Sequence, residues 1–214
     1  MKDRCLLYRF VRGSTAIWLK VWLKLESHGA ENVPAAGGCV LASNHASYLD
    51  PPIVACGLKH RIVRFMARDT LFAGTFRNWF FHGIRCVPLD RTRGDVAALR
   101  KGIQILKEGE VLGLFPEGTR SPDGQLKPAK GGIGFLVAKA GVPVVPVYVG
   151  GSFEAFPKGA QRIRRGKVFI YYGQPIAFEE IARLGQDRDS YQAIGDLIMS
   201  KIAHLREQAL VSPR

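Results

Sequence analysis

The sequence predicts an α/β protein whose open, mostly parallel twisted sheet carries helices on both faces and follows an amphipathic two-helix element. After residue 30, short runs rich in β-branched residues alternate with longer helical stretches, which is typical of a sheet with crossover helices. The chain has 214 residues, of which 47% are hydrophobic and 23% charged, so it can build one ordinary globular core. We therefore expect a helical element over residues 1–27 and a single α/β domain over residues 28–214.

The N-terminal segment mixes apolar and basic residues. Gly13 and Ser14 can end one short helix and cap the next, which gives two helices over about residues 3–26. The second would be about 18 Å long, too short for a hydrocarbon core of about 30 Å. Its apolar arc fits either a helix lying in a membrane interface or a helix packed on the protein's own core. The residues that would contact a membrane are Trp18, Trp22, Lys20 and Lys24.

The later elements follow from composition and periodicity. Strands are expected near residues 39–43, 62–66, 85–89, 111–115, 144–149 and 167–172. Helices are expected over residues 51–58, 69–81, 93–108, 130–140 and 188–209. The apolar run from Val142 to Val147 contains Pro143 and Pro146, and proline cannot donate to a ladder. This strand therefore fits either a sheet edge or the wall of an apolar tunnel.

Charge and cysteine content limit the possible partners. The formal net charge of +13 indicates a negatively charged partner, such as nucleic acid, anionic lipid, a phosphorylated metabolite or an acidic protein. The four cysteines form no CxxC pair, which argues against a zinc site and a disulfide framework and indicates buried thiols in a reducing compartment. Basic residues interrupt the first 25 residues, so no secretory signal is expected.

An imidazole and a carboxylate follow directly on the first expected strand. His45 and Asp50 lie five residues apart, beyond the carboxyl end where open α/β sheets place their sites. Asp50 can fix the tautomer of the imidazole, which makes His45 a candidate general base. Alternatively, Asp50 before Pro51 is a helix N-cap and His45 an ordinary loop residue.

The signatures of several enzyme classes are missing. The sequence has no GxSxG or HExxH motif, and neither glycine-rich phosphate fingerprint is complete. A base without an enzyme nucleophile would activate a hydroxyl or water that the substrate side supplies.

A long loop after the strand at 111–115 holds candidate phosphate ligands. Gly118 allows a sharp turn, and the Arg120 guanidinium and the Thr119 hydroxyl can grip phosphate oxygens, with Glu117 orienting Arg120 or accepting a bond from a substrate hydroxyl. These residues also make a serviceable turn without any ligand. Arg91 follows another parallel strand, so it can converge with Arg120 at the same edge of the sheet.

Four blocks over about residues 28–150 resemble, in order and separation, those of the glycerolipid acyltransferases. NHASYLD matches the first block at His45 and Asp50, and VPLDR matches the second at Arg91. FPEGTRS and VPVVPV match the third and fourth. The family's second block usually carries a glycine where this chain has Arg85, which puts the wall around the acceptor in question.

The resemblance implies transfer of a fatty acyl chain from coenzyme A or an acidic acyl carrier protein to the free hydroxyl of a lysophospholipid, foremost 1-acyl-glycerol 3-phosphate. It implies His45 as general base and Asp50 as its partner, with no metal or resident cofactor. The implied acceptor phosphate site comprises Arg91, Glu117, Gly118, Thr119 and Arg120. The implied acyl channel comprises Val142, Pro143 and Pro146.

The remaining expectations concern surfaces and rival functions. The resemblance and the basic charge imply a peripheral or monotopic protein on the cytoplasmic, anionic face of a membrane. A basic run over residues 158–167 fits contact with anionic lipid, a carrier protein or coenzyme A phosphates, or a solvated loop. The rivals are a nucleic-acid-binding module and a catalytically silent membrane protein. Exposed aromatics interleaved with basic residues or a recognition motif would indicate the former, and neither is evident.

Overall fold

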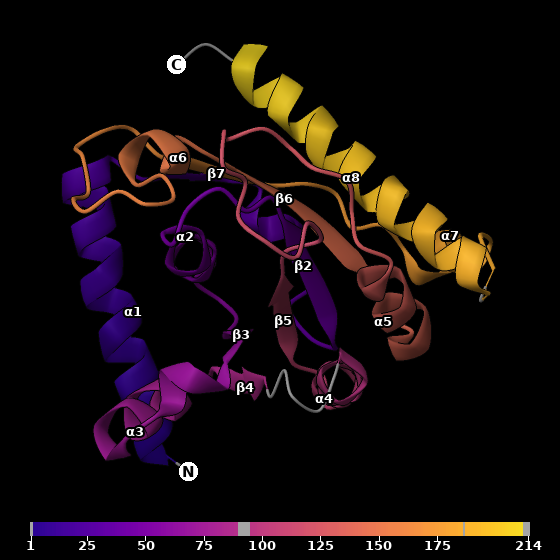
Figure 1. Ribbon diagram of the computed structural model, residues 1–214, viewed down its shortest axis with the longest axis horizontal. Helices are drawn as coiled ribbons and strands as arrows, with labels where there is room; N and C mark the ends of the chain where they lie inside the picture. The colour runs from indigo at the N-terminus through magenta and orange to yellow at the C-terminus, as the bar shows by residue number, and fades with distance from the viewer. Residues whose placement is uncertain (1, 90–94, 186, 212–214) are drawn as a thin grey trace.

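In the computed structural model, one sheet lies between two groups of helices (Figure 1). The structure describes residues 2–89, 95–185 and 187–211. The strands are β1 (Glu26–His28), β2 (Cys39–Ser43), β3 (Val63–Arg68), β4 (Val87–Leu89), β5 (Val111–Leu114), β6 (Val144–Gly150) and β7 (Phe169–Tyr172). The longer helices are α1 (Lys2–Leu23), α2 (Asp50–Gly57), α3 (Thr75–Gly83), α4 (Asp95–Lys107), α5 (Gly132–Ala140) and α8 (Arg188–Val211). The shorter ones are η1 (Ala30–Asn32), η2 (Asp69–Phe72), α6 (Ser152–Ala155) and α7 (Phe178–Ala182).

The described strands form a seven-stranded sheet in the order β1-β7-β6-β2-β5-β3-β4. Neighbouring strands run parallel except at the β6–β7 pair, which is antiparallel. This confirms the open, mostly parallel sheet, and all six expected strands are present to within two residues. Strand β1 was not predicted, because its three residues are exposed and none is apolar, so no hydrophobic pattern marks them.

The expected edge position of β6 is wrong, because β6 lies inside the sheet between β7 and β2. Its proline is tolerated for a local reason. Pro146 falls between the last β7 pair, Val147 with Tyr172, and the isolated Val144–Ile176 bridge. Directly after β7, the Gly173 amide still donates to the Pro146 carbonyl over 2.8 Å, so Pro146 forgoes only the bond that an N–H of its own would have given beyond the last regular pair.

Two hydrophobic clusters occupy the two faces of the sheet, because side chains alternate along each strand. In β2, Cys39 and Leu41 point toward α1 and α2, whereas Val40 and Ala42 point toward the helices on the opposite face. That face is covered by α4, α5 and α8, as Figure 1 shows. The sheet is therefore buried on both sides, and its residues next to the strand ends are the ones available for a site.

The N-terminal element is one continuous helix, so the expectation of two helices is wrong. Ser14 does not cap a second helix; its hydroxyl donates to the carbonyl of Val11, 3.1 Å away, within the same helix. One face of α1 packs on the core through Leu19 and Leu23, which are fully buried. Within the described ranges we find no helix whose length and hydropathy would allow it to span a bilayer.

The opposite face of α1 is apolar and exposed. At 100° per residue, four of its exposed apolar side chains fall within an arc of roughly 60°. They are Leu6, Phe10, Ile17 and Val21. The indole rings of Trp18 and Trp22 lie beside this stripe and are 38% and 37% exposed. The face of α1 that packs on the core and the apolar face that is open to solvent are therefore different faces of the same helix.

Candidate active site

Two loops that leave adjacent parallel strands form the centre of the site. In the register of β2 with β5, Ala42 pairs with Leu114. The loop after β2 carries His45, and the loop after β5 carries Glu117. Because both strands end at the same edge, these loops are brought together: the His45 amide donates to Glu117 Oε1 over 2.9 Å, and the Ser121 amide donates to the His45 carbonyl over 2.7 Å.

The imidazole of His45 is held by the Asp50 carboxylate. Nδ1 of His45 lies 2.8 Å from Oδ2 of Asp50, and the same oxygen accepts from the amides of Ala46 and Ser47, each over 2.7 Å. Asp50 is fully buried, whereas the His45 side chain is 16% exposed. A carboxylate accepts at Nδ1, so that nitrogen carries the proton and Nε2 is left as an acceptor.

The alternative role of Asp50 as a helix N-cap is not what the structure shows. Asp50 is the first residue of α2, the N-cap position belongs to Leu49, and no side-chain cap bond is made there. A second contact holds the His45 ring, because the ring of Phe115 stacks on it with centroids 3.9 Å apart and planes inclined by 16°. The imidazole is thus confined on two sides.

Asn44 anchors this loop to the sheet, a role that was not predicted. Its amide nitrogen donates to the Val149 carbonyl over 3.0 Å, and its amide oxygen accepts from the Val149 N–H over 2.8 Å. A side chain thereby extends the β2–β6 pairing past the end of β2. Its position directly before His45 was a usable signal, since an Asn amide can mimic a peptide group.

Glu117 is buried beside the imidazole. Burial raises the pKa of its carboxyl from the usual 4.5 to about 7, although the hydrogen bond from the His45 amide acts in the opposite direction. Oε2 of Glu117 is buried, and none of the residues that the structure describes offers it a hydrogen bond. Glu117 therefore both ties the two loops together and presents a second oxygen with spare bonding capacity.

Arg120 and Lys130 bring positive charge to the same loop. The Arg120 guanidinium carbon lies 3.4 Å from the ring centroid of Tyr48, and Arg120 Nη1 is buried with no hydrogen-bond partner among the described residues. Gly118 has a φ of 68°, and a Cβ there would lie 2.9 Å from Cδ and 3.3 Å from Nζ of Lys130. The positive φ of this turn favours glycine at position 118, and the Lys130 side chain lies over it. Thr119 is exposed, and its hydroxyl is near the Arg120 carbonyl.

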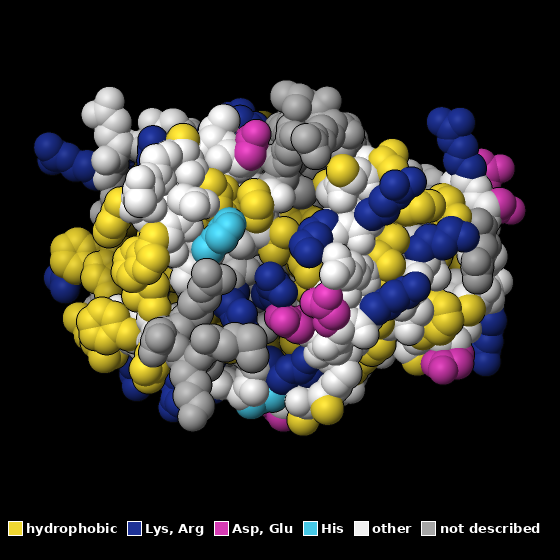
Figure 2. All heavy atoms as spheres, turned by 90° about the horizontal axis from the view of Figure 1, so that it is seen from below, with side chains coloured by type: hydrophobic (Ala, Val, Ile, Leu, Met, Phe, Trp, Pro, Cys, Tyr) yellow, Lys and Arg dark blue, Asp and Glu magenta, His cyan; other side chains and the backbone are white. Residues whose placement is uncertain are grey.

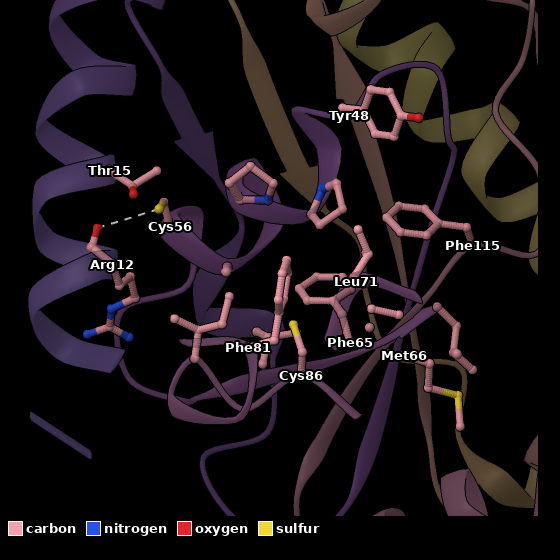
Figure 3. Close-up of a pocket in the computed structure, with 18 of the residues that line it drawn as sticks. Arg12, Thr15, Tyr48, Cys56, Phe65, Met66, Leu71, Phe81, Cys86 and Phe115 are labelled. Atoms are coloured by element: carbon pink, nitrogen blue, oxygen red, sulfur yellow. Dashed lines mark hydrogen bonds between the residues drawn. The ribbon is translucent and has the colours of Figure 1, made fainter. Parts of the chain in front are cut away.

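An apolar cavity of about 620 Å³ opens at His45 and Gly118 and extends along the α1/α2 face of the sheet (Figure 3). In Figure 3, Arg12 and Thr15 of α1 lie on one side of it and Phe115 on the other. Its hydrophobic walls come from α1, α2, β3, η2 and α3. Representative lining residues are Val11, Ala55, Phe65, Met66, Leu71 and Phe81.

Several expected site residues lie elsewhere. Arg91 falls outside the described residues. Val142 belongs to the hydrophobic cluster on the opposite face of the sheet, and Pro143 directly precedes β6, whose start lies at the edge away from His45. Pro146 is buried within β6, and none of the three lines the cavity at His45. The fourth sequence block, VPVVPV, therefore does not line this cavity.

The backbone conformation at Arg85 accounts for the glycine that the family usually has at this position. Its φ is 67°, in the left-handed region where only glycine lacks steric strain. The neighbouring residues Ile84 and Cys86 line the cavity. A non-glycine residue is therefore held in a strained turn next to the cavity wall.

The four expected membrane contacts, Trp18, Lys20, Trp22 and Lys24, are all exposed on or just after α1. Helix α3, which packs beside the N-terminal end of α1 (Figure 1), adds further exposed aromatic residues, with Phe76 at 73% and Trp79 at 58%. Figure 2 shows hydrophobic side chains gathered on the side of the molecule formed by α1 and α3. In the part of the chain that the structure describes, no three His, Cys, Asp or Glu side chains lie close enough together to hold a metal ion.

Comparisons with known proteins identify the family of the chain. The Acyltransferase family model matches residues 24–150, which is more than half of the chain. The 1-acyl-sn-glycerol-3-phosphate acyltransferase of Bacillus subtilis is 25% identical over 202 residues, covering 94% of this chain and 98% of that protein. The corresponding chloroplast protein of Brassica napus is 35% identical over 158 residues, and the chain spans 45% of its length.

Among solved structures, the 1-acyl-sn-glycerophosphate acyltransferase PlsC of Thermotoga maritima has a TM-score of 0.75 and 29% sequence identity, covering 96% of this chain and 84% of that one. The resemblance carried by the four sequence blocks is thereby confirmed. The chain belongs to the acyltransferase family.

Proposed function

We propose that this acyltransferase moves a fatty acyl chain from a thioester to the free hydroxyl of 1-acyl-glycerol 3-phosphate, which gives phosphatidic acid. The observation that carries the proposal is the His45–Asp50 pair at the mouth of an apolar cavity, with the Arg120 guanidinium on the adjoining loop. The relatives in Bacillus subtilis and Brassica napus are named for this acceptor. Another lysolipid is the alternative acceptor, because Arg85 replaces the usual glycine.

The chemistry follows from the position of the imidazole. Nε2 of His45 takes the proton from the acceptor hydroxyl as its oxygen attacks the thioester carbon, and the buried Asp50 carboxylate stabilises the positive charge on the ring. An oxygen–carbon bond forms, the carbon–sulfur bond breaks, and the thiolate leaves with the proton from the imidazolium. No covalent acyl-enzyme is required, since the acceptor itself supplies the nucleophile.

The acceptor phosphate is bound by the loop after β5. Arg120 offers a planar guanidinium whose buried Nη1 has no partner in the described part of the chain, and the Lys130 ammonium lies over Gly118. Thr119 is exposed at the same loop, and Glu117 Oε2 is free to bond a glycerol hydroxyl. Arg91 remains a predicted contributor from the sequence alone.

The acyl chain occupies the cavity between the sheet and helices α1, α2 and α3. Its volume of about 620 Å³ and its apolar walls suit a hydrocarbon chain with the thioester near His45. This assignment replaces Val142, Pro143 and Pro146 as the acyl channel, because those residues are not among the cavity lining. Acyl-CoA or acyl carrier protein serves as co-substrate, and the reaction needs no resident cofactor or metal.

We also propose that the protein sits peripherally on the cytoplasmic, anionic face of a membrane. The exposed apolar stripe of α1 and the tryptophans beside it suit the interface, and Lys20 and Lys24 extend toward headgroups. No nucleic-acid partner is proposed, because most of the exposed aromatic residues lie on α1 and α3 among other exposed apolar side chains, and the sequence carries no nucleic-acid recognition motif.

The test is to incubate the purified protein with a labelled acyl thioester and a panel of lysolipids, and to identify the product by mass spectrometry. We expect labelled phosphatidic acid from the parent and none above background from His45→Ala. Asp50→Asn should lower kcat by about three to four orders of magnitude, because the amide favours the wrong imidazole tautomer. Turnover of His45→Ala near the parent rate would remove His45 from the mechanism. Acylation of a different lysolipid in place of 1-acyl-glycerol 3-phosphate would overturn the proposed acceptor.

A further inference from the structure

A strongly basic segment lies outside the site described so far. Residues 158–167, here called the basic segment, contain five Lys or Arg residues and no acidic residue. All five side chains are exposed: Lys158, Arg162, Arg164, Arg165 and Lys167. A local charge of this density on one short connection is costly in self-repulsion, which favours a negatively charged partner.

The segment is fixed against the C-terminal end of α1. The Arg165 guanidinium lies 4.5 Å from the ring centroid of Trp22, and Lys167 Nζ lies 2.8 Å from a carboxylate oxygen of Glu26. Two backbone bonds of Val168, the residue directly after the segment, complete the attachment: its N–H donates to the Leu23 carbonyl over 2.9 Å, and its carbonyl accepts from the Glu26 amide over 3.0 Å. Figure 1 shows the chain after α6 passing beside this end of α1.

We propose that the basic segment binds the anionic headgroups of a lipid bilayer while the exposed face of α1 enters the interface beside it. Trp22 joins the two, because its ring lies both beside the apolar stripe of α1 and under Arg165. A bilayer offers apolar and anionic surface at adjacent depths, which matches this arrangement. An acidic carrier protein would satisfy the charge of the segment but would leave the adjoining apolar stripe uncovered.

The same segment is connected to the catalytic loop. The Ser47 hydroxyl donates to the Phe156 carbonyl over 2.8 Å, and the ring of Tyr48 lies 6.4 Å from that of Phe156. Phe156 leads directly into the basic segment. Headgroup binding would therefore hold the membrane surface on the side where the loop of His45 meets its lipid substrate. The inference rests on the proposed membrane association, but it concerns a different part of the chain.

The experiment uses a charge-neutralised variant, Lys158→Gln with Arg162→Gln and Arg164→Gln, which leaves the internal partners Arg165 and Lys167 in place. Its partition onto vesicles with roughly 30% phosphatidylglycerol should fall about 100-fold, because each basic residue near such a surface contributes a factor of about five. Binding to pure phosphatidylcholine vesicles should change little. Sedimentation at low and high salt measures both, and the parent's advantage should shrink at high salt.

Two control variants isolate the effect. Neutralising Lys107, Arg183 and Lys201, which are exposed on α4, after α7 and on α8, removes the same charge elsewhere and should preserve most of the binding. Exchanging the three segment residues for the other basic type, as in Lys158→Arg with Arg162→Lys and Arg164→Lys, should restore partition to near the parent value. Equal losses in the segment and control variants would overturn the inference, and so would unchanged partition of the segment variant.

Turnover measurements separate the remaining explanations. With acyl-CoA and detergent-dispersed lysolipid, the segment variant should turn over at the parent rate. A raised KM for acyl-CoA, or for an acyl carrier protein thioester, with unchanged vesicle binding would assign the segment to the donor and overturn lipid binding. His45→Ala should bind vesicles like the parent while losing turnover, so failure of the proposed function and failure of this inference are distinguishable.

Discussion

The guanidinium of Arg120 rests on the ring of Tyr48, with 3.4 Å between the guanidinium carbon and the ring centroid. The two residues come from different loops, one after β2 and one after β5, and both belong to the walls of the site. Tyr48 makes this contact although its side chain is 64% exposed. The ring therefore acts as a platform that orients the guanidinium, and Tyr48 is a positioning residue.

Replacing Tyr48 with Leu should raise the KM for the lysophosphatidate acceptor by roughly 3- to 30-fold, because a cation–π contact contributes about 0.5–2 kcal/mol. The kcat should stay near the parent value, since the ring touches no reacting atom. Tyr48→Phe keeps the aromatic face and should behave like the parent in steady-state kinetics. The role would be refuted by Phe and Leu variants with equally raised KM, or by a loss confined to kcat.

Replacing Asn44 with Ala should lower the free energy of unfolding by about 1–3 kcal/mol, because the N–H and carbonyl of Val149 would both lose a buried partner. Urea denaturation measures the change. The matched control is Asn78→Ala on the exposed surface of α3, which should stay within about 0.5 kcal/mol of the parent. Equal stabilities of the two variants would show that Asn44 does not anchor the loop.

Glu117 should make the folded protein less stable as the pH rises. Its folded-state pKa of about 7 lies above the usual 4.5, so between these values the folded protein binds more protons than the unfolded chain. The free energy of unfolding should therefore fall as pH rises through this window and level off above it. Glu117→Gln should lose this part of the slope, measured by urea denaturation at a series of pH values.

The control for this slope is Glu154→Gln, an exposed carboxyl on α6 that should leave the pH profile unchanged. If Glu117→Gln kept the parent's fall in stability between pH 4.5 and 7, burial would not raise the pKa of Glu117 as stated.

Variants at position 85 should reveal the strain of the left-handed backbone there, since the φ of Arg85 is 67°. Arg85→Gly relieves the steric cost, while Arg85→Ala removes the same side chain and keeps it. The Gly variant should therefore be the more stable of the two by about 1 kcal/mol, despite the greater chain entropy of glycine in the unfolded state. Thermal unfolding compares them directly, and an Ala variant at least as stable as the Gly variant would contradict the assignment.

Long elements with a clear hydrophobic period were predictable because burial leaves a trace in the sequence. The fully buried β2 and the amphipathic α4 were both expected within about two residues of their observed bounds. Strand β1 left no such trace, since Glu26, Ser27 and His28 are all exposed. The continuity of α1 through Gly13 and Ser14 was also missed, because packing of Leu19 and Leu23 on the core outweighs local cap preferences.

The candidate catalytic pair was predictable from spacing, because His45 and Asp50 lie within one short loop and need no long-range contact to meet. The apolar cavity beside this pair was not predictable, since the residues around it come from α1, α2, β3 and α3, which only the packed chain brings together. The interior position of β6 and the Tyr48–Arg120 contact were hidden for the same reason.

The sequence by itself determined the alternation of strands and helices, the loop chemistry at His45 and Glu117, and the membership in a family that its four blocks indicated. Tertiary structure decided strand order, the wall of the cavity and the neighbours of each charged group. The hydrophobic periodicity of a segment indicates which of its faces is buried. The element that packs on that face depends on the packing of segments that are far apart in the chain.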